Sequence, residues 1–290
     1  MLGDLHIHMI LDGIFYRSAI DAHKSAPVDR LIRQRLEEYR QRGAVFLRDG
    51  GDRWGVSLRA KELAAEYGID YRSPAFPIHK AGHYGGFIGR GFSTWREYEG
   101  LLDEVEEKGG DFVKLMISGL IDFSKADTLT EESLPKEDIS TMIRLAHRRG
   151  FAVMAHANGD EAVNAALEAG VDSIEHGAYL STQTLQALAA SGAVWVPTLS
   201  TIGNLVGCGR FPDEVLSPLL RSQQEKVALT ASLGGKIGLG SDAGAYGVYH
   251  GRAISQELSY LKAALGSQAE AHLQSTEAYV KTVFLQKSGV

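Results

Sequence analysis

A regular alternation of short apolar segments and amphipathic segments runs through this chain of 290 residues and limits the folds open to it. The segments with the length and apolar character of β-strands are 4–9, 44–50, 69–75, 112–118, 151–157, 173–177, 194–200 and 236–242. The segments with helical periodicity are 30–43, 58–68, 95–110, 136–150, 160–170, 182–192, 214–235 and 254–265. Such alternation favours a parallel sheet, and eight units favour its closure into an α/β (β/α)8 TIM barrel. A doubly wound open sheet stays as an alternative, although no Gly-rich phosphate loop follows the first strand.

The helix predictions depend on the spacing of apolar residues. Ile139, Met142, Ile143 and Ala146 lie at i, i+3, i+4 and i+7, which forms a stripe that can pack on a sheet. Helical patterning resumes over 272–289. We therefore expect a single domain over 1–290, with the barrel at 4–265 and a helical C-terminal extension at 266–290.

Composition excludes several classes of partner and site. The net charge of −6 argues against a nucleic-acid or anionic-membrane surface, so we expect a small-molecule substrate. Cys208 is the only cysteine, which excludes disulfides and thiolate metal sites within the chain. No apolar stretch reaches membrane-spanning length, and the first strand leaves no room for a signal peptide. These features predict a soluble, cytoplasmic protein, and they leave a homo-oligomer open.

Metal-binding residue types recur at the carboxyl ends of the predicted strands. The segment DLHIHM places His6 and His8 on one face of the first strand, because side chains at i and i+2 point the same way. The other candidates are Lys114 on the fourth strand, His156 on the fifth, His176 on the sixth and Asp242 on the eighth. Each residue alone has a structural explanation, such as a core histidine or a turn-forming aspartate. Together they indicate a metal site, because the carboxyl ends of barrel strands meet at one mouth.

Four segments carry a resemblance to the amidohydrolase superfamily: DLHIH, FVKLM, MAHANGDEAVNAALEAGVDSIEHG and GLGSDAG. The third of them most resembles the branch of imidazolonepropionase-like proteins and metal-dependent Xaa-Pro or Xaa-Arg dipeptidases. The resemblance implies a binuclear centre of two divalent ions, with zinc expected and manganese, iron or cobalt as alternatives. It implies that His6 and His8 hold one ion with Asp242, that His156 and His176 hold the other, and that Lys114 bridges both as a CO2-derived carbamate. The small β-sandwich of many relatives is expected to be missing, which would leave the lower barrel mouth open to an oligomer interface.

The resemblance also implies an activity. A metal-bridging hydroxide would cleave an amide C–N bond in a dipeptide, an N-acyl amino acid or a cyclic amide, with Asp242 carrying the proton to the departing amine. Alternatives are a lactonase-like or phosphotriesterase-like ester hydrolase on the same centre, a one-metal deaminase and a non-catalytic metal-binding barrel. Lys114 argues against a deaminase and against TatD-like nucleases, which have an acidic residue at that strand.

Loops at the barrel mouth are expected to set specificity. The longest follow the first, third and seventh strands, at 10–27, 76–94 and 201–212. The second of these is rich in glycine and is expected to act as a flexible lid. His83 and Tyr84 in that lid, and His250 after the eighth strand, are predicted to bind substrate. His250 would reach a substrate carboxylate or a developing oxyanion.

Overall fold

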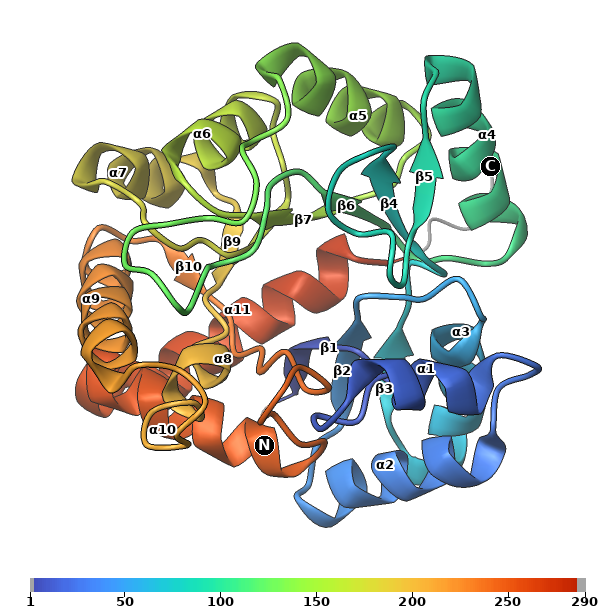
Figure 1. Cartoon of the computed structure of the whole chain (residues 1–290), viewed down its shortest axis with the longest axis horizontal. Helices are drawn as coiled ribbons and strands as arrows, with labels where there is room; N and C mark the ends of the chain where they lie inside the picture. The colour runs from blue at the N-terminus through green and yellow to red at the C-terminus, as the bar shows by residue number, and fades with distance from the viewer. Residues whose placement is uncertain (1–2, 286–290) are drawn as a thin grey trace.

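The computed structural model describes residues 3–285, which form an α/β barrel with helices outside the strands (Figure 1). Its strands are β1 (Asp4–Ile7), β2 (Phe46–Asp49), β3 (Asp70–Arg72), β4 (Pro77–Lys80), β5 (Arg90–Phe92), β6 (Val113–Met116), β7 (Val153–Ala157), β8 (Ser173–His176), β9 (Val194–Val196) and β10 (Lys236–Ile237). All pairings between these strands are parallel, in the orders β1-β2-β3 and β10-β9-β8-β7-β6-β4-β5. The predicted TIM barrel is confirmed.

The barrel departs from eight regular strands in two places, at its closure and at its third strand. The backbone beyond β10 closes onto β1, because Leu5 N donates to Leu239 O at 2.8 Å and Asp242 N donates to His6 O at 2.7 Å. The third barrel strand, predicted at 69–75, consists of two pieces. β3 pairs with β2, β4 pairs with β6, and Ala75 between them has a left-handed φ of 64°. β5 then pairs with β4 in the loop region after the third strand.

The predicted helices are all present. The helices are α1 (Tyr16–His23), α2 (Asp29–Gln41), α3 (Val56–Ala64), α4 (Trp95–Glu107), α5 (Lys136–Arg148), α6 (Asp160–Glu168), α7 (Thr182–Ser191), α8 (Ser200–Gly203), α9 (Asp213–Ser232), α10 (Arg252–Leu265) and α11 (Ala269–Val283). The predicted stripe on α5 is fully buried. Four elements were not predicted from the sequence, namely α1, α8, β4 and β5, which lie in or next to the three long loops.

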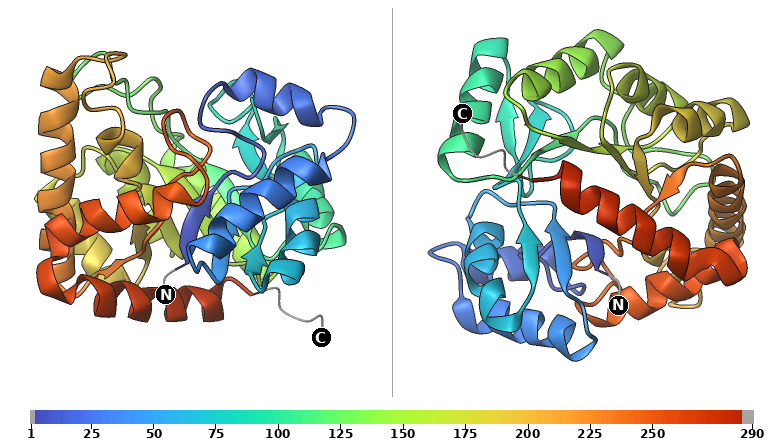
Figure 2. Two further views of the ribbon diagram at one scale, coloured as in Figure 1. Left: turned by 90° about the horizontal axis from the view of Figure 1, so that it is seen from below. Right: turned by 180° about the vertical axis from the view of Figure 1, so that it is seen from behind.

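The C-terminal helix α11 covers the end of the barrel opposite the loops that carry the candidate site (Figure 2). Val280 and Phe284 pack there against Leu5, Phe46 and Phe112, which are buried at the amino ends of their strands. The chain thus supplies its own cover where an open lower mouth had been expected. The predicted extension at 272–289 is helical from Ala269 to Val283, and residues 286–290 lie outside the described part of the chain.

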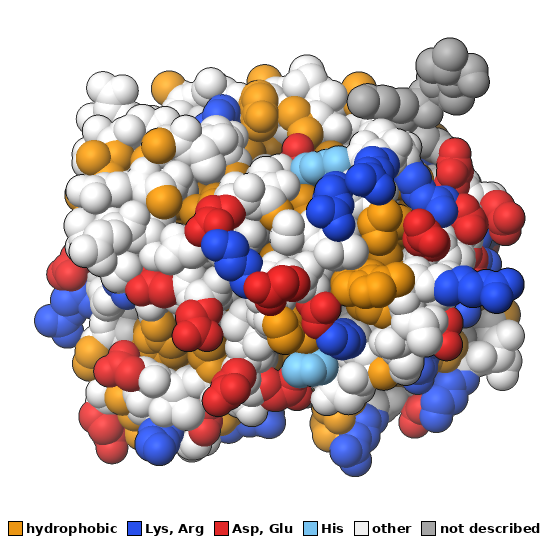
Figure 3. Space-filling model, turned by 90° about the horizontal axis from the view of Figure 1, so that it is seen from above, with side chains coloured by type: hydrophobic (Ala, Val, Ile, Leu, Met, Phe, Trp, Pro, Cys, Tyr) orange, Lys and Arg blue, Asp and Glu red, His pale blue; other side chains and the backbone are white. Residues whose placement is uncertain are grey.

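The outer surface carries side chains of both charges, as expected for a net charge of −6. The face shown in Figure 3 intermixes Lys and Arg with Asp and Glu and has scattered apolar side chains between them. Within residues 3–285, none of the helices has the length and apolar character that crossing a bilayer requires.

Candidate metal centre

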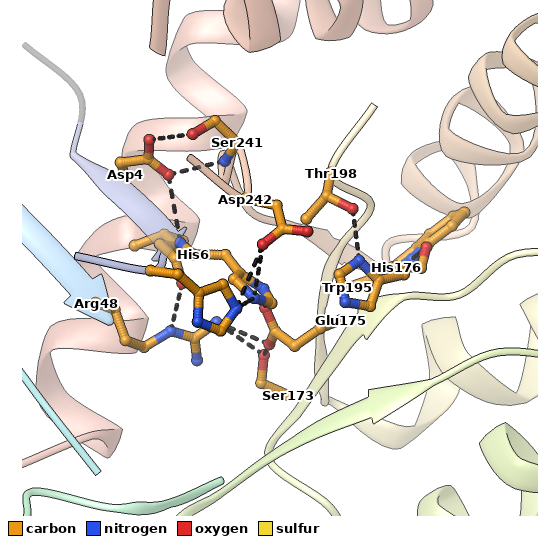
Figure 4. Close-up of polar contacts among 12 residues, drawn as sticks. Asp4, His6, Arg48, Ser173, Glu175, His176, Trp195, Thr198, Ser241 and Asp242 are labelled. Carbon is orange, nitrogen blue, oxygen red and sulfur yellow. Dashed lines mark hydrogen bonds and ion pairs between the residues drawn. The ribbon is translucent and has the colours of Figure 1, made fainter. Parts of the chain in front are cut away.

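Five of the six predicted metal-binding side chains come from the carboxyl-terminal part of a strand or after one, and Lys114 lies one position into its strand. His6 lies on β1 and His8 just after it, Lys114 on β6, His156 on β7, His176 at the end of β8, and Asp242 after β10. His6, His176 and Asp242 approach one another in Figure 4. His176 and Asp242 have left-handed φ values of 69° and 60°, which are uncommon for residues other than glycine and are typical of functional sites.

Three of these residues have the spacing of a metal site. Asp242 Oδ1 lies 3.5 Å from His6 Nε2 and 3.4 Å from His8 Nε2, and the two ring nitrogens are 3.4 Å apart. A tetrahedral zinc ion with bonds of about 2.0–2.1 Å requires ligand atoms about 3.3–3.5 Å apart. His6, His8 and Asp242 therefore fit three ligands of one ion, and the structure brings their ligand atoms together without rearrangement.

The other two histidines face the same space. The ring of His176 lies 4.6 Å from that of His156 and 5.1 Å from that of His6, between centroids. His156 Nε2 is 3.0 Å from Gly119 O and His176 Nδ1 is 2.8 Å from Thr198 Oγ1. When His156 Nε2 donates to Gly119 O and His176 Nδ1 donates to Thr198 Oγ1, His156 Nδ1 and His176 Nε2 keep their lone pairs for a metal.

Burial keeps these histidines neutral. It lowers the pKa of His8 and of His156 to about 3, and Lys114 nearby lowers the pKa of each further. Burial also lowers the pKa values of His6 and His176 well below the usual value. A neutral imidazole is the form that binds metals, so near pH 7 the protein presents ligands rather than cations.

Lys114 is the unusual member of the group. Its ammonium nitrogen Nζ is buried and has no hydrogen-bond partner among the described residues, although a buried polar atom is normally paired. Burial lowers the pKa of Lys114 to about 8, with Arg48 acting in the same direction and Glu175 and Asp242 opposing it. The buried, unpaired amine fits a residue that is completed by a further group.

A cavity of about 600 Å³ adjoins the candidate ligands. His8, His156, His176 and Asp242 form part of its wall, which places the candidate ligands at its inner end. Concave sites of this size, mainly apolar with a few convergent polar groups, are typical of small-molecule binding.

Comparison with known proteins agrees with this geometry. The model of the amidohydrolase family matches residues 84–281. The chain belongs to the amidohydrolase family. Enzymes of this family hydrolyse amide bonds and generally bind divalent metals.

Individual relatives of this amidohydrolase are distant. An uncharacterized protein of Mycobacterium tuberculosis is 29% identical over 276 residues, which cover 90% of this chain and 67% of the relative. The ochratoxinase of Aspergillus niger is 28% identical over 95 residues, or 33% of this chain and 20% of that protein. Among solved structures, a Xaa-Pro dipeptidase with bound methionine has a TM-score of 0.75 at 20% identity, covering 99% of this chain and 77% of that one. The structure of A. niger ochratoxinase has a TM-score of 0.75 at 19% identity, covering 96% of this chain and 69% of that one. These structural likenesses show the shared barrel fold.

Beneath the ligands of the amidohydrolase centre lies a buried charged network that the sequence analysis missed. Glu175 Oε2 is 2.6 Å from His6 Nδ1, and Glu175 Oε1 accepts from Arg48 Nη2 at 2.8 Å (Figure 4). Arg48 also donates to Leu5 O at 2.7 Å and to Ser173 Oγ at 3.1 Å. The sequence does carry a signal for this network. Arg48 and Glu175 are charged residues inside predicted apolar strands, and a charged residue in such a strand is rarely buried without a partner.

Two further residues shape the amidohydrolase site. Asp4 accepts hydrogen bonds from Ser241 N at 2.8 Å and Ser241 Oγ at 2.5 Å, and so holds the backbone that leads into Asp242. Gly50 leaves room for the His8 ring, since a Cβ added there would lie 2.3 Å from His8 Cε1.

The three predicted substrate-binding residues have different outcomes. Tyr84 lies in the cavity wall, with its ring centroid 5.0 Å from that of His156. His83 does not line the cavity, and its Nδ1 is 3.8 Å from Glu131 Oε2. His250 is buried away from the cavity, with Nε2 2.8 Å from Leu11 O and Nδ1 3.2 Å from the Tyr39 hydroxyl. The expected contact of His250 with substrate is therefore not met, because both ring nitrogens bind within the protein.

Proposed function

We propose that this protein is a metal-dependent hydrolase that cleaves the C–N bond of an amide in a small molecule. The observation that carries the proposal is the arrangement of His6, His8 and Asp242, with ligand atoms 3.4–3.5 Å apart, at the inner end of a cavity of about 600 Å³. Membership of the amidohydrolase family supports the same reaction.

The residues present fit two divalent ions. His6, His8 and Asp242 would hold one, and His156 and His176 would hold the other. Nitrogen and oxygen ligands suit zinc, with manganese, iron or cobalt as alternatives. When bound, such ions lower the pKa of water and polarise a carbonyl group.

Lys114 would join the two halves of the centre as a carbamate. Its neutral amine would attack the carbon of CO2, forming an N–C bond and releasing one proton, and the product would be an anionic ligand with two oxygens. The lowered pKa of Lys114 supports this step, because only the neutral amine is a nucleophile. The absence of any hydrogen-bond partner for Nζ among the described residues also supports it.

Asp242 would move the proton during hydrolysis. Its Oδ1 faces His6 and His8, which leaves Oδ2 to take a proton from the attacking water and pass it to the amine nitrogen. Water adds across the C–N bond, so the products are a carboxylic acid and an amine. Burial raises the pKa of Asp242 to about 7, with Asp4 and Glu175 acting in the same direction and Lys114 opposing it. A pKa near the working pH suits a group that must both accept and release a proton.

A substrate panel with controlled metal content tests the proposal. The purified protein is stripped with a chelator, reloaded with zinc or manganese, and assayed on dipeptides, N-acyl amino acids, cyclic amides, lactones and aryl phosphotriesters. We expect metal-dependent release of amines from at least one amide class and two metal ions per chain by elemental analysis. Turnover of lactones or phosphotriesters alone would assign an ester hydrolase. One metal ion per chain, with no turnover of any of these substrates, would contradict the proposal and favour a deaminase.

A further inference from the structure

One wall of the cavity is a continuous row of aromatic rings. The row runs from Phe15 at the mouth through Tyr16, Phe87 and Tyr84 to His156 at the candidate metal centre, with successive centroids 6.2, 5.9, 5.7 and 5.0 Å apart. These separations are those of interacting aromatic pairs. An aromatic or long apolar group can therefore contact ring surface along the whole path from solvent to the ligands.

The mouth itself exposes apolar side chains to solvent. Of the residues that line the cavity, Ile14 is 61% exposed, Phe15 is 56% exposed and Leu120 is 40% exposed. Clustered exposed apolar residues around a cavity are typical of a binding site, since isolated protein surface seldom gathers them. A small, zwitterionic dipeptide would leave much of this surface in water and would place its ammonium group against apolar walls.

The cavity wall also includes one cationic side chain, Arg210, that has no carboxylate partner among the described residues. The Arg210 guanidinium carbon lies 3.9 Å from the ring centroid of Tyr246 and 5.4 Å from that of Phe211. Within residues 3–285, no carboxylate oxygen lies within 4.0 Å of this guanidinium. Stacking orients the guanidinium plane and leaves its edge N–H groups free, which is the geometry that binds a carboxylate through two hydrogen bonds.

Asp122, the acidic residue of the cavity wall besides the candidate ligand Asp242, already accepts hydrogen bonds within the protein. Asp122 Oδ1 accepts from Ser124 N at 2.9 Å and from Ser124 Oγ at 2.5 Å, and so closes a local turn. Arg210 is thus the cavity's cation available to an anionic ligand.

From the row of rings and the unpaired Arg210 we propose a substrate class, which rests on the proposed amide hydrolysis at this site. The substrates are amides that join a bulky aromatic or long apolar group to a part bearing a free carboxylate. The apolar group lies along the row from Phe15 to Tyr84, and the carboxylate pairs with Arg210.

Binding tests this assignment independently of turnover. Dansylglycine combines a large aromatic group with a carboxylate through a sulfonamide, which is not an amide substrate, and dansylglycinamide lacks the charge. We expect the metal-loaded protein to bind dansylglycine about 10-fold more tightly, by fluorescence titration, and the Arg210→Gln variant to lose this difference. Arg221→Gln is the matched control, because Arg221 is exposed on α9 outside the cavity. Equal affinity of the wild-type protein for both ligands, or an unchanged difference in Arg210→Gln, would overturn the role of Arg210.

Turnover tests the aromatic row. We expect kcat/KM for N-(2-naphthoyl)glycine to exceed that for N-acetylglycine by about 10- to 200-fold, the range for burial of one large apolar side chain. Phe15→Ala should reduce the first value by a larger factor than the second, so that the ratio of the two values falls, and folding should not be affected because Phe15 is largely exposed. Equal kcat/KM values for the two substrates would overturn the assignment. Arg210-dependent dansylglycine binding without hydrolysis of any amide would support the ligand class and contradict the proposed reaction.

Discussion

His6 Nδ1 lies 2.6 Å from Glu175 Oε2, and both side chains are fully buried. The contact fixes which nitrogen of His6 carries its proton, so that Nε2 presents a lone pair beside His8 and Asp242. Glu175 in turn pairs with Arg48, whose guanidinium carbon lies 4.5 Å from the Phe284 ring centroid. The candidate metal centre is thus linked through a buried ion pair to the C-terminal end of the described chain, at the opposite end of the barrel.

Glu175→Gln should weaken metal binding by about 10- to 100-fold, because the amide no longer holds His6 in one tautomer. Metal affinity measured by competition with a chromogenic chelator checks this. Thermal unfolding should also shift downward, since Arg48 becomes an unpaired buried charge. Glu66→Gln, which alters a half-exposed surface ion pair, is the control and should leave metal affinity unchanged. Wild-type affinity in Glu175→Gln would contradict the positioning role.

Lys114→Ala should lose the binuclear centre and activity together, because the bridging ligand is removed. Elemental analysis and turnover are measured side by side, and short carboxylates such as acetate with added metal should restore part of both. Lys136→Ala, at an exposed residue on α5, is the control. Full metal content and full activity in Lys114→Ala would rule out the bridge.

Asp242→Asn should reduce kcat by about 100- to 10,000-fold, the range for removal of a proton carrier. Metal content is determined on the same samples, because Asp242 is also a proposed ligand. Turnover normalised to bound metal separates the loss of proton transfer from the loss of metal. An unchanged normalised kcat would exclude proton transfer by Asp242.

Gly91→Ala should destabilise the fold by about 1–3 kcal/mol, because an overpacked side chain forces neighbours to move. The added Cβ would lie 2.9 Å from His79 Cε1 and 3.1 Å from His79 Nε2, and Gly85 and Gly89 confine the same ring. Gly100→Ala in α4 is the control: no atom lies within 4 Å of its added Cβ, so it should stabilise by about 0.5–1 kcal/mol. Chemical denaturation measures both. Equal stability of Gly91→Ala and the wild-type protein would show that the loop or the His79 ring moves and accommodates the added methyl group.

Phe284→Ala should cost about 3–5 kcal/mol, the usual range for removal of a buried phenylalanine. Phe284 is fully buried against Phe112, with ring centroids 5.3 Å apart, and it covers Arg48. Leu285→Ala next to it removes a side chain that is 43% exposed and should change stability little. Similar midpoints of denaturation for the two variants would show that the helix α11 does not seal the barrel.

The fold and the candidate ligands were predictable because their evidence is local. Strand and helix periodicity depends on neighbouring residues, as on α5, and in a parallel barrel the carboxyl ends of all the strands lie at one mouth. His6, His8, Lys114, His156, His176 and Asp242 could therefore be assigned to a common place without coordinates. The irregular segments escaped prediction because α1, β4 and β5 are short and lie among turn-forming residues.

The sequence by itself determined a (β/α)8 barrel and the types of residue that lie at its mouth. Only the tertiary structure decided how those residues are held and what surrounds them. Glu175 meets His6 across 169 residues of chain, and His250 meets Leu11 O across 239. Such contacts depend on how strands and loops pack in three dimensions, and no local sequence pattern predicts them. For the same reason, the row of rings from Phe15 to His156 and the placement of Arg210 became visible only once the loops were placed together.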